Sequence, residues 1–334
     1  MRYITATAIA LFTCLQGTAS QEILVDLDAP DYDRWMYPFN GNPGTRTVAP
    51  TFCAFGYEIF DERDGQALLG FHTDSSVQIG LGSSSYEIQS ATLTIMIDNT
   101  GVIYDDSPDP WETFVEEGPA DDDQGRSVIA SGVNFRGEFD GWSFGEDGAF
   151  GSLGTGVRNA YPIDFDSNGA VRDISNNVGQ GFQPNPFGVG NAEGVVSGDL
   201  IPEYTEIRFE LDVLDPDISC YLKQGLNDGL INFIISSFHV GSQDGSGSYP
   251  NWIMKENSLV FFELAEAAGL EMTVKVVQPS ETEGDVTGDG TVGIADLLDV
   301  ISTWGRCPCC RSDINGDGSV DISELLNVIS NWGD

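Results

Sequence analysis

Basic residues are scarce in this sequence. Lysine and arginine together number 14 against 53 aspartates and glutamates, so the 334-residue chain carries a formal net charge of −39. A surface this acidic repels phosphate groups, which excludes nucleic acids and anionic membranes as expected partners. Histidine occurs only at His72 and His239, and neither has a Cys or His at a metal-binding spacing. A zinc hydrolase is therefore not expected.

Clear signatures of catalysis are also missing. The chain contains no phosphate-binding P-loop and no dinucleotide-binding strand–turn–helix fingerprint. A Ser-His-Asp triad stays open, because such triads are recognised by geometry and not by sequence position. Acidic pairs of the glycosidase type are too numerous to choose from among 53 acids, so no catalytic residue is named. The sequence favours a protein without catalytic activity and leaves an enzyme as the alternative.

Long apolar runs are limited to the N-terminus. Arg2 precedes an uncharged, mostly apolar run from Ile4 to Leu15, and small residues follow at Gly17 to Ser20. This order is typical of a secretory signal peptide, so residues 1–20 are expected to be cleaved off. No later segment reaches the roughly 18 apolar residues that a membrane span requires. We therefore expect a protein without a membrane span that is secreted, either extracellular or at the cell surface.

Five cysteines follow the expected cleavage site. In an oxidising compartment most of them should pair. Cys53 and Cys220 both lie in the larger part of the chain and could bridge each other. Cys307, Cys309 and Cys310 form a tight cluster in which one pair would leave an odd thiol, free or bonded to another chain. A zinc site built on these three thiolates is the alternative.

An internal repeat near the C-terminus carries the strongest signal. Residues 285–305 and 313–333 are offset by 28 residues and are identical at 13 of 21 positions. Each copy begins with a twelve-residue calcium-type loop, in which oxygens at positions 1, 3, 5, 7 and 12 surround the ion and a glycine at position 6 makes the turn. The expected ligands are Asp285, Thr287, Asp289, Thr291 and Asp296 in the first loop, and Asp313, Asn315, Asp317, Ser319, Asp321 and Glu324 in the second.

The two loops differ at position 9, which is Gly293 in the first and Asp321 in the second. The extra carboxylate predicts tighter calcium binding by the second loop. A short helix is expected after each loop, and helices of about ten residues are unstable alone, so the two should pack together with the metal fixing the loops. One apolar face per helix is predicted to consist of Leu297, Leu298, Ile301 and Trp304, and of Leu325, Leu326, Ile329 and Trp332.

These paired loop–helix units resemble the dockerin family over residues 285–334. The cysteines between the copies and the Trp-Gly ending of each copy are similar to the cysteine-bearing dockerin variant at the C-termini of secreted bacterial proteins. The resemblance implies a module that binds two calcium ions and docks onto a cohesin-type or other surface receptor, or serves as a sorting tag. The family's contact positions, 10 and 11 of each loop, are here Ile294-Ala295 and Ile322-Ser323 instead of the Ser-Thr pair of cellulosomal dockerins.

The larger part of the chain, residues 21–278, is predicted to be mainly β, and residues 279–284 are expected to form a polar linker. No long amphipathic helix is expected, and the best candidate, Glu263–Gly269, spans barely two turns. Many short strands separated by turn residues predict a two-sheet β-sandwich of jelly-roll type, followed by a small all-α module at 285–334. Alternation of apolar and polar residues predicts strands at Ala91–Ile97, Ile207–Val213, Leu230–Val240 and Met272–Val276.

Two features of the larger part are candidate ligand sites. Asp164, Asp166 and Asn168 occupy positions 1, 3 and 5 of a calcium-like turn, for which a solvated Asx turn is the alternative. Aromatic rings that could stack on sugars are the second feature, and filling of the protein core is their alternative role. These rings lie in Asp33–Phe39 and at Trp111, Trp142 and Trp252. The acidic run Asp121–Asp123 is interpreted as solvated loop charge.

The leading hypothesis is a secreted modular protein whose C-terminal module binds calcium and docks, and whose β-sandwich binds extracellular polysaccharide. One alternative is a glycoside hydrolase or polysaccharide lyase carried by the same module. A second alternative is a structural cell-surface protein whose only interaction module is its tail.

Overall fold

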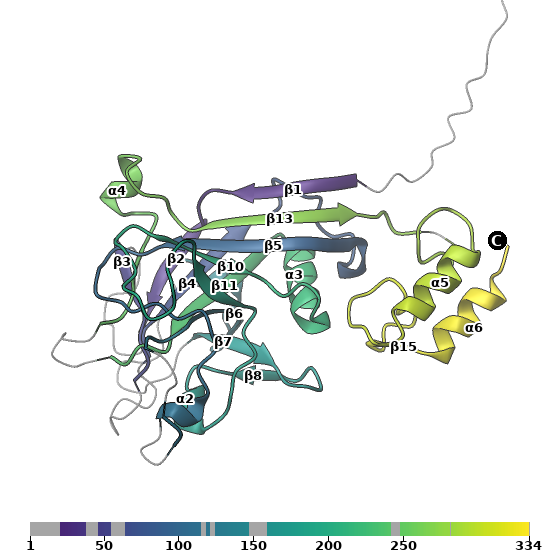
Figure 1. Cartoon of the computed structure of the whole chain (residues 1–334). Coiled ribbons are helices and arrows are strands. Elements are labelled where there is room, and N and C mark those ends of the chain that lie inside the picture. Colours follow the sequence, from purple (N-terminus) through teal and green to yellow (C-terminus); the bar gives the residue numbers. More distant parts are fainter. Residues whose placement is uncertain are drawn as a thin grey trace, which may run out of the picture.

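The computed structural model describes residues 21–37, 46–54, 64–114, 118–120, 124–146, 159–241, 248–280 and 282–333. The predicted signal peptide at 1–20, the run Asp121–Asp123 and Phe39 lie outside the described residues. Within the described part, antiparallel strands make up most of the regular structure, which confirms the expected mainly β class. Figure 1 shows this β body with a small helical unit at the C-terminal end.

Within the described residues, eleven strands form one antiparallel sheet that curls around the core. Its order is β1-β13-β5-β10-β9-β6-β11-β4-β2, with β7 pairing with β6, and β8 with β7 (Figure 1). The strands are β1 (Gln21–Leu27), β2 (Tyr32–Met36), β4 (Gln66–His72), β5 (Tyr86–Met96), β6 (Val128–Phe135), β7 (Ala160–Phe165), β8 (Val171–Asp173), β9 (Gly188–Ala192), β10 (Glu206–Glu210), β11 (Leu230–Ser237) and β13 (Gly269–Val276). Two short strands, β3 (Val48–Pro50) and β12 (Asn251–Ile253), pair with each other.

The predicted strands at 91–97, 230–240 and 272–276 correspond to β5, β11 and β13, with shifted ends. Alternation along β5 buries Leu93 and Ile95 in the core, whereas Thr92 and Thr94 lie on the opposite face of the sheet. The strand predicted at 207–213 is shorter, because β10 ends at Glu210 and the chain then turns toward a helix.

That helix, α3 (Pro216–Asp228), contradicts the expectation that no long amphipathic helix is present. Its end signals are in the sequence. Asp215 caps the N-terminus by accepting from two backbone amides, Pro216 occupies the first turn, and Gly229 ends the helix with a φ of 84°. The prediction of a helix at Glu263–Gly269 is wrong, because the single turn α4 (Ser258–Phe261) precedes that segment.

Helix α3 has a weak sequence signal because its apolar stripe is narrow. Ile218, Leu222 and Leu226 recur every four residues and are buried against the sheet, while polar residues occupy most of the remaining positions. A stripe one residue wide gives a weak periodic signal, although it is enough to dock the helix once the sheet is in place.

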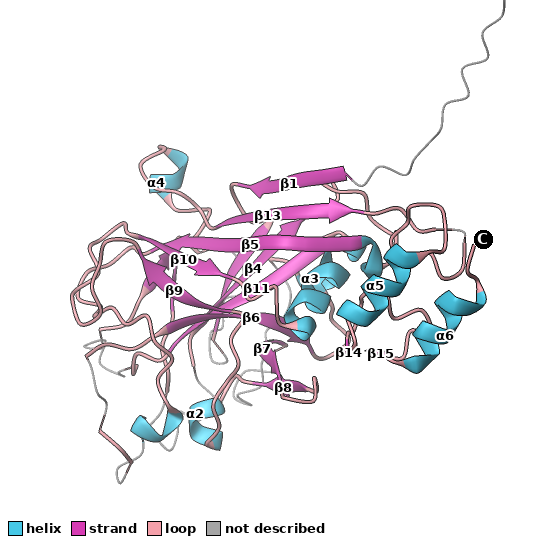
Figure 2. Cartoon of the chain, turned by 45° about the vertical axis from the view of Figure 1, so that its right-hand side comes forward, coloured by secondary structure: helices cyan, strands magenta, loops and turns pink. Residues whose placement is uncertain are grey.

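The C-terminal unit contains α5 (Ile294–Ser302) and α6 (Ile322–Ser330). Val300 and Val328 are fully buried between the helices. The prediction of a purely helical unit is corrected by a two-stranded ladder, β14 (Gly305–Arg306) with β15 (Ser319–Val320). Figure 2 shows these elements next to α3 of the β body.

One of the two disulfides joins the two parts of the chain. Cys220 of α3 is bonded to Cys309, and Cys307 is bonded to Cys310. The suggested Cys53–Cys220 bridge is therefore wrong, and the odd cysteine of the C-terminal cluster is bonded to Cys220, neither free nor bonded to another chain. The zinc site, which was the alternative for this cluster, is not formed, because all three of its cysteines are in disulfides. The physical reason is the position of α3, which brings Cys220 next to the segment between the repeats.

Candidate functional site

The first predicted calcium loop is a turn held together by carboxylates. Asp285 accepts hydrogen bonds from the backbone amides of Gly288, at 2.7 Å, and Gly290, at 2.9 Å. Asp296, at the end of the loop, accepts from the amide of Gly293 at 2.8 Å. Gly290 has a φ of 91°, a left-handed conformation that a residue with a Cβ rarely adopts, which explains the glycine at position 6.

The second loop repeats this network 28 residues later. Asp313 accepts from the amides of Gly316, at 2.9 Å, and Gly318, at 2.8 Å. Glu324 accepts from the amide of Asp321 at 2.8 Å. The other predicted ligands lie in the same two turns; they are Thr287, Asp289 and Thr291 in the first, and Asn315, Asp317 and Ser319 in the second.

Three of the carboxylates in these loops are buried. The exposed fractions of Asp285, Asp296 and Glu324 are 4%, 0% and 1%. Oε1 of Glu324 has no hydrogen-bond partner among the described residues. Burying a carboxylate is costly unless its charge is compensated, and an all-oxygen donor set is the one that calcium prefers. The residues present therefore match calcium in the chemistry of their donors, although the carboxylates of neither loop are gathered within 4.8 Å of one another.

The residues predicted to form one apolar face on each C-terminal helix do not all point the same way: some pack inward and others point outward. Leu297 and Leu325 pack on the small core between the helices. Their neighbours point outward and are about half exposed: Leu298, Ile301 and Trp304 at 58%, 52% and 52%, and Leu326, Ile329 and Trp332 at 54%, 51% and 50%. Ile294 and Ile322 are exposed at 68% and 61%. We call these eight residues the outer apolar faces.

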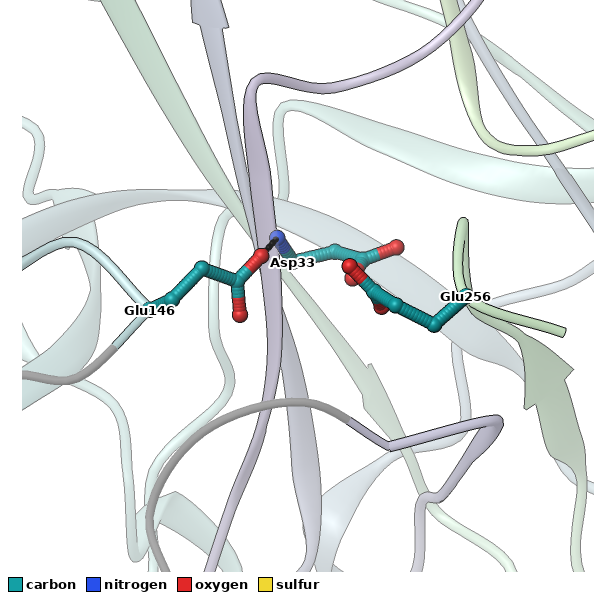
Figure 3. Close-up of side chains that lie close together, drawn as sticks. All are labelled: Asp33, Glu146 and Glu256. Atoms are coloured by element: carbon teal, nitrogen blue, oxygen red, sulfur yellow. Dashed lines mark hydrogen bonds between the residues drawn. The ribbon is translucent and has the colours of Figure 1, made fainter.

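A second group of acids lies in the β body. One oxygen from each of Asp33, Glu146 and Glu256 lies within 4.8 Å of the others (Figure 3). Asp33 comes from β2, Glu146 follows α1 (Gly141–Phe144), and Glu256 follows β12. Among the described residues, this is the one group of three or more His, Cys, Asp or Glu side chains whose ligand atoms all lie within 4.8 Å of one another, and the acids of the two C-terminal loops do not meet that condition.

Lys255 partly neutralises this acidic cluster. Its backbone amide donates to Oδ2 of Asp33 at 2.7 Å, and its ammonium donates to Glu256 at 2.6 Å and also to Glu146. The pKa of Asp33 is raised to about 7, mainly by burial. The hydrogen bond from the Lys255 amide lowers this pKa, and the negative charge of Glu256 raises it. Burial opposes the charged form of Lys255, but its hydrogen bonds to Glu146 and Glu256 raise the pKa above its usual value.

The sequence offered no signal for this cluster. Its three acids are separated by more than a hundred residues along the chain and belong to no shared motif. In a chain with 53 acids, only the pairing of strands shows which ones meet.

A groove of about 710 Å³ lies on the outer face of the sheet. Its floor includes Thr92 and Thr94 of β5 and Arg208 of β10, and its wall is the segment that follows α4. Phe261 and Phe262 lie in sequence between two of its lining residues, Val260 and Glu263, and are exposed at 80% and 65%. Six acids line the groove, namely Asp26, Asp28, Glu206, Glu263, Glu266 and Glu271.

The calcium-like turn at 164–168 does not gather its side chains. Asp164 is fully buried and binds the Arg172 guanidinium, with a 2.8 Å bond to Nε. Asp166 accepts from the amides of Asn168 and Ala170 at 2.8 and 2.9 Å, which is an Asx turn. The Asx turn that the sequence left open as the alternative is present at Asp166, whereas Asp164 is buried and paired with Arg172.

The predicted aromatic platform is dispersed. Trp252 is fully buried in the core, and Trp35 stacks on Tyr37 with ring centroids 4.8 Å apart. Trp142 is 53% exposed and stacks on His72. Trp111 lies on a 3₁₀ turn beside Gly181.

A G-x-S-x-G nucleophile elbow was not expected in this chain, but residues 141–145 do have the G-x-S-x-G spacing. They do not form the strand–turn–helix elbow of hydrolases, because Ser143 lies on the single turn α1. The Ser143 hydroxyl donates to the Asp140 carboxylate at 2.7 Å in a capping box, which accounts for this serine structurally.

A scan against models of protein families finds no match for this chain, and a search of curated proteins finds none either. The resemblance of residues 285–334 to dockerins therefore depends on their own loop and helix pattern. Among the described residues, none of the helices has the length and apolar character needed to cross a lipid bilayer.

Proposed function

We propose that the protein is secreted and that its C-terminal unit is a calcium-dependent docking module. The observation that carries this proposal is the repeated geometry of the two loops and the outer apolar faces that follow them. Side chains as large as Trp304 and Trp332 are normally buried, so their exposure at equivalent positions of two repeats favours a protein partner that covers them. A cohesin-type surface receptor is the partner that the resemblance implies.

Calcium has a direct part in this proposal. The loops place carboxylates at positions 1 and 12 close to backbone amides, and an ion would neutralise the buried charge that remains. Each loop leads directly into α5 or α6. Fixing the loops therefore fixes the angle between the helices and the relative position of the outer apolar faces.

Binding to purified cohesin domains tests the proposal. The full mature chain, immobilised, should retain a cohesin domain in calcium and release it in a chelator. Replacing both Trp304 and Trp332 with alanine should abolish retention, because two large exposed anchors are lost. A matched control is Leu24→Ala, which removes an apolar side chain of β1 that is 59% exposed. Failure of cohesins from several types to bind, or equal binding in chelator, would contradict the proposal.

For the β body we propose a jelly-roll sandwich that binds extracellular polysaccharide in the groove on its outer face. Carboxylates and the Thr92 and Thr94 hydroxyls can bind sugar hydroxyls, while Phe261 and Phe262 offer apolar rings for sugar faces.

Retention of the mature chain on insoluble polysaccharides tests this second proposal. Phe261→Ala with Phe262→Ala should lose retention, whereas Leu214→Ala, at a 91% exposed site elsewhere, should keep it. Release of new reducing ends would favour the alternative of a glycoside hydrolase or lyase. Absence of retention on every polymer would favour a structural surface protein.

A further inference from the structure

We propose that Asp33, Glu146 and Glu256 form a third calcium site, located in the β body and independent of the two C-terminal loops. The three acids already lie close enough to share an ion. Two oxygens bound to one calcium at about 2.3–2.6 Å can be at most about 4.6–5.2 Å apart. The observed separations, all within 4.8 Å, lie inside this range of limits and suit calcium–oxygen distances of about 2.4 Å or more.

The hydrogen bonds of the cluster leave one oxygen of each carboxylate unused. Oδ2 of Asp33 accepts from the Lys255 amide, and Oε1 of Glu146 accepts from the Asp33 amide at 3.2 Å. Oε1 of Glu256 accepts from the Lys255 ammonium. The second oxygens are buried and have no hydrogen-bond partner among the described residues; they are Oδ1 of Asp33, Oε2 of Glu146 and Oε2 of Glu256.

Burial distinguishes this cluster from surface acids. The Asp33 side chain has no exposed surface, while those of Glu146 and Glu256 are 22% and 29% exposed. Asp33 thus supplies from the interior an oxygen, Oδ1, that has no hydrogen-bond partner and lies 4.0 Å from the Lys255 ammonium, and the two glutamates leave a route for the ion from solvent. Buried carboxylate oxygens without a partner are rare in folded proteins, because each one loses its hydration without compensation.

Charge identifies the class of ligand. With all three carboxylates ionised, they and the Lys255 ammonium sum to −2, which one divalent cation neutralises. The donors are all carboxylate oxygens, which select a hard ion such as calcium over a softer transition metal. The three donors come from β2, from the end of α1 and from the segment after β12, so the ion would join three distant parts of the body.

Counting bound ions in the mature full-length protein tests this inference. Native mass spectrometry after equilibration with calcium should give three ions for the wild type. A variant with Asp285→Ala and Asp313→Ala, which disables both loops, should keep one ion. Adding Glu256→Gln to that variant should remove the last ion, because Gln keeps an oxygen acceptor for Lys255 but loses the charge.

Glu87→Gln added to the same loop-deficient variant is the matched control. Glu87 also pairs with a lysine, Lys275, at 2.7 Å and is partly exposed, but it lies outside the cluster. This variant should keep one ion. If Glu256→Gln disturbs folding, Asp33→Asn provides a second removal of charge, with circular dichroism confirming the fold.

Lys255→Met tests calcium binding through the calcium affinity, which would not change if the cluster had a purely structural role. Removing the ammonium raises the net negative charge of the site, so calcium affinity should increase by about tenfold or more. No ion in the loop-deficient variant, or an ion that survives both Glu256→Gln and Asp33→Asn, would overturn the inference. If the wild type binds a single ion and only Glu256→Gln removes it, this result would support the site in the β body and contradict calcium binding by the two C-terminal loops.

Discussion

Cys220 and Cys309 are joined by a disulfide across 89 residues of chain, with Cα atoms 5.3 Å apart. The bond ties helix α3 of the β body to the segment between the two calcium loops. Arg306 of the same segment forms an ion pair with Asp217 in the first turn of α3. The C-terminal unit is thus held in one orientation on the body, which determines where its outer apolar faces point.

Removing this disulfide should loosen the C-terminal unit without unfolding it. In the chain-entropy view, closing a loop of this length contributes about 4–5 kcal/mol to the free energy of unfolding. Cys220→Ser with Cys309→Ser should therefore lower the melting temperature and speed proteolysis near residues 279–284. The matched control, Cys307→Ser with Cys310→Ser, opens a much shorter loop. Equal effects of the two double variants would show that the link between α3 and the unit is unimportant.

The two calcium loops should differ in affinity. Asp313→Ala leaves only the first loop intact, and Asp285→Ala leaves only the second. Because the second loop carries the additional carboxylate of Asp321, calorimetry should find tighter calcium binding in the Asp285→Ala variant. Circular dichroism should show calcium-induced helix in both single variants and none in the double variant. Equal affinities would show that position 9 does not contribute a ligand.

Alanine substitutions at the adjacent residues Val300 and Ile301 should lower stability by very different amounts, because Val300 points into the core between the helices and Ile301 points outward. Val300 is fully buried between α5 and α6, so Val300→Ala should lower the free energy of unfolding of the unit by roughly 1–3 kcal/mol. Ile301→Ala removes more apolar volume but from an exposed site, so its effect should stay within about 0.5 kcal/mol. Chemical denaturation followed by tryptophan fluorescence measures both. The reverse order would mean that the helices pack through their outer faces.

Stability should depend on pH through His239. Burial lowers the pKa of His239 to about 4 from its usual value of 6.5. Its Nε2–H donates to the Ile103 carbonyl at 3.1 Å, and Nδ1 accepts from the Ser237 hydroxyl at 2.8 Å, so the folded protein holds the neutral ring. Above pH 6.5 the ring is neutral in both states and its contribution to stability is complete.

As the pH falls from 6.5 to 4, the unfolded chain binds a proton that the folded protein does not, so stability is lost over this window. The pKa difference corresponds to about 3 kcal/mol. Denaturant midpoints measured from pH 7.5 to 4 should therefore fall less steeply for His239→Gln than for the wild type. Parallel pH profiles would mean that His239 is protonated equally in both states.

The calcium loops were predictable from the sequence because all their contacts are local. Asp285 and Asp313 bind amides three and five residues away, and each loop starts the helix that follows it, so twelve contiguous residues contain the information. Strands such as β5 were predictable for a similar reason, since alternation is a property of neighbouring residues. Helix α3 was also encoded locally by Asp215, Pro216 and Gly229, but its narrow stripe gave less signal than its ends.

Tertiary structure alone decided which distant residues meet. The approach of Asp33 to Glu146 and Glu256 depends on three segments that the curled sheet brings together, and no spacing in the chain encodes it. The partner of Cys220 depends on the side of the body on which α3 lies. Helical periodicity placed Leu297 and Leu298 on one face, but only the position of α6 determines that the first is packed and the second exposed, because burial requires a neighbouring element.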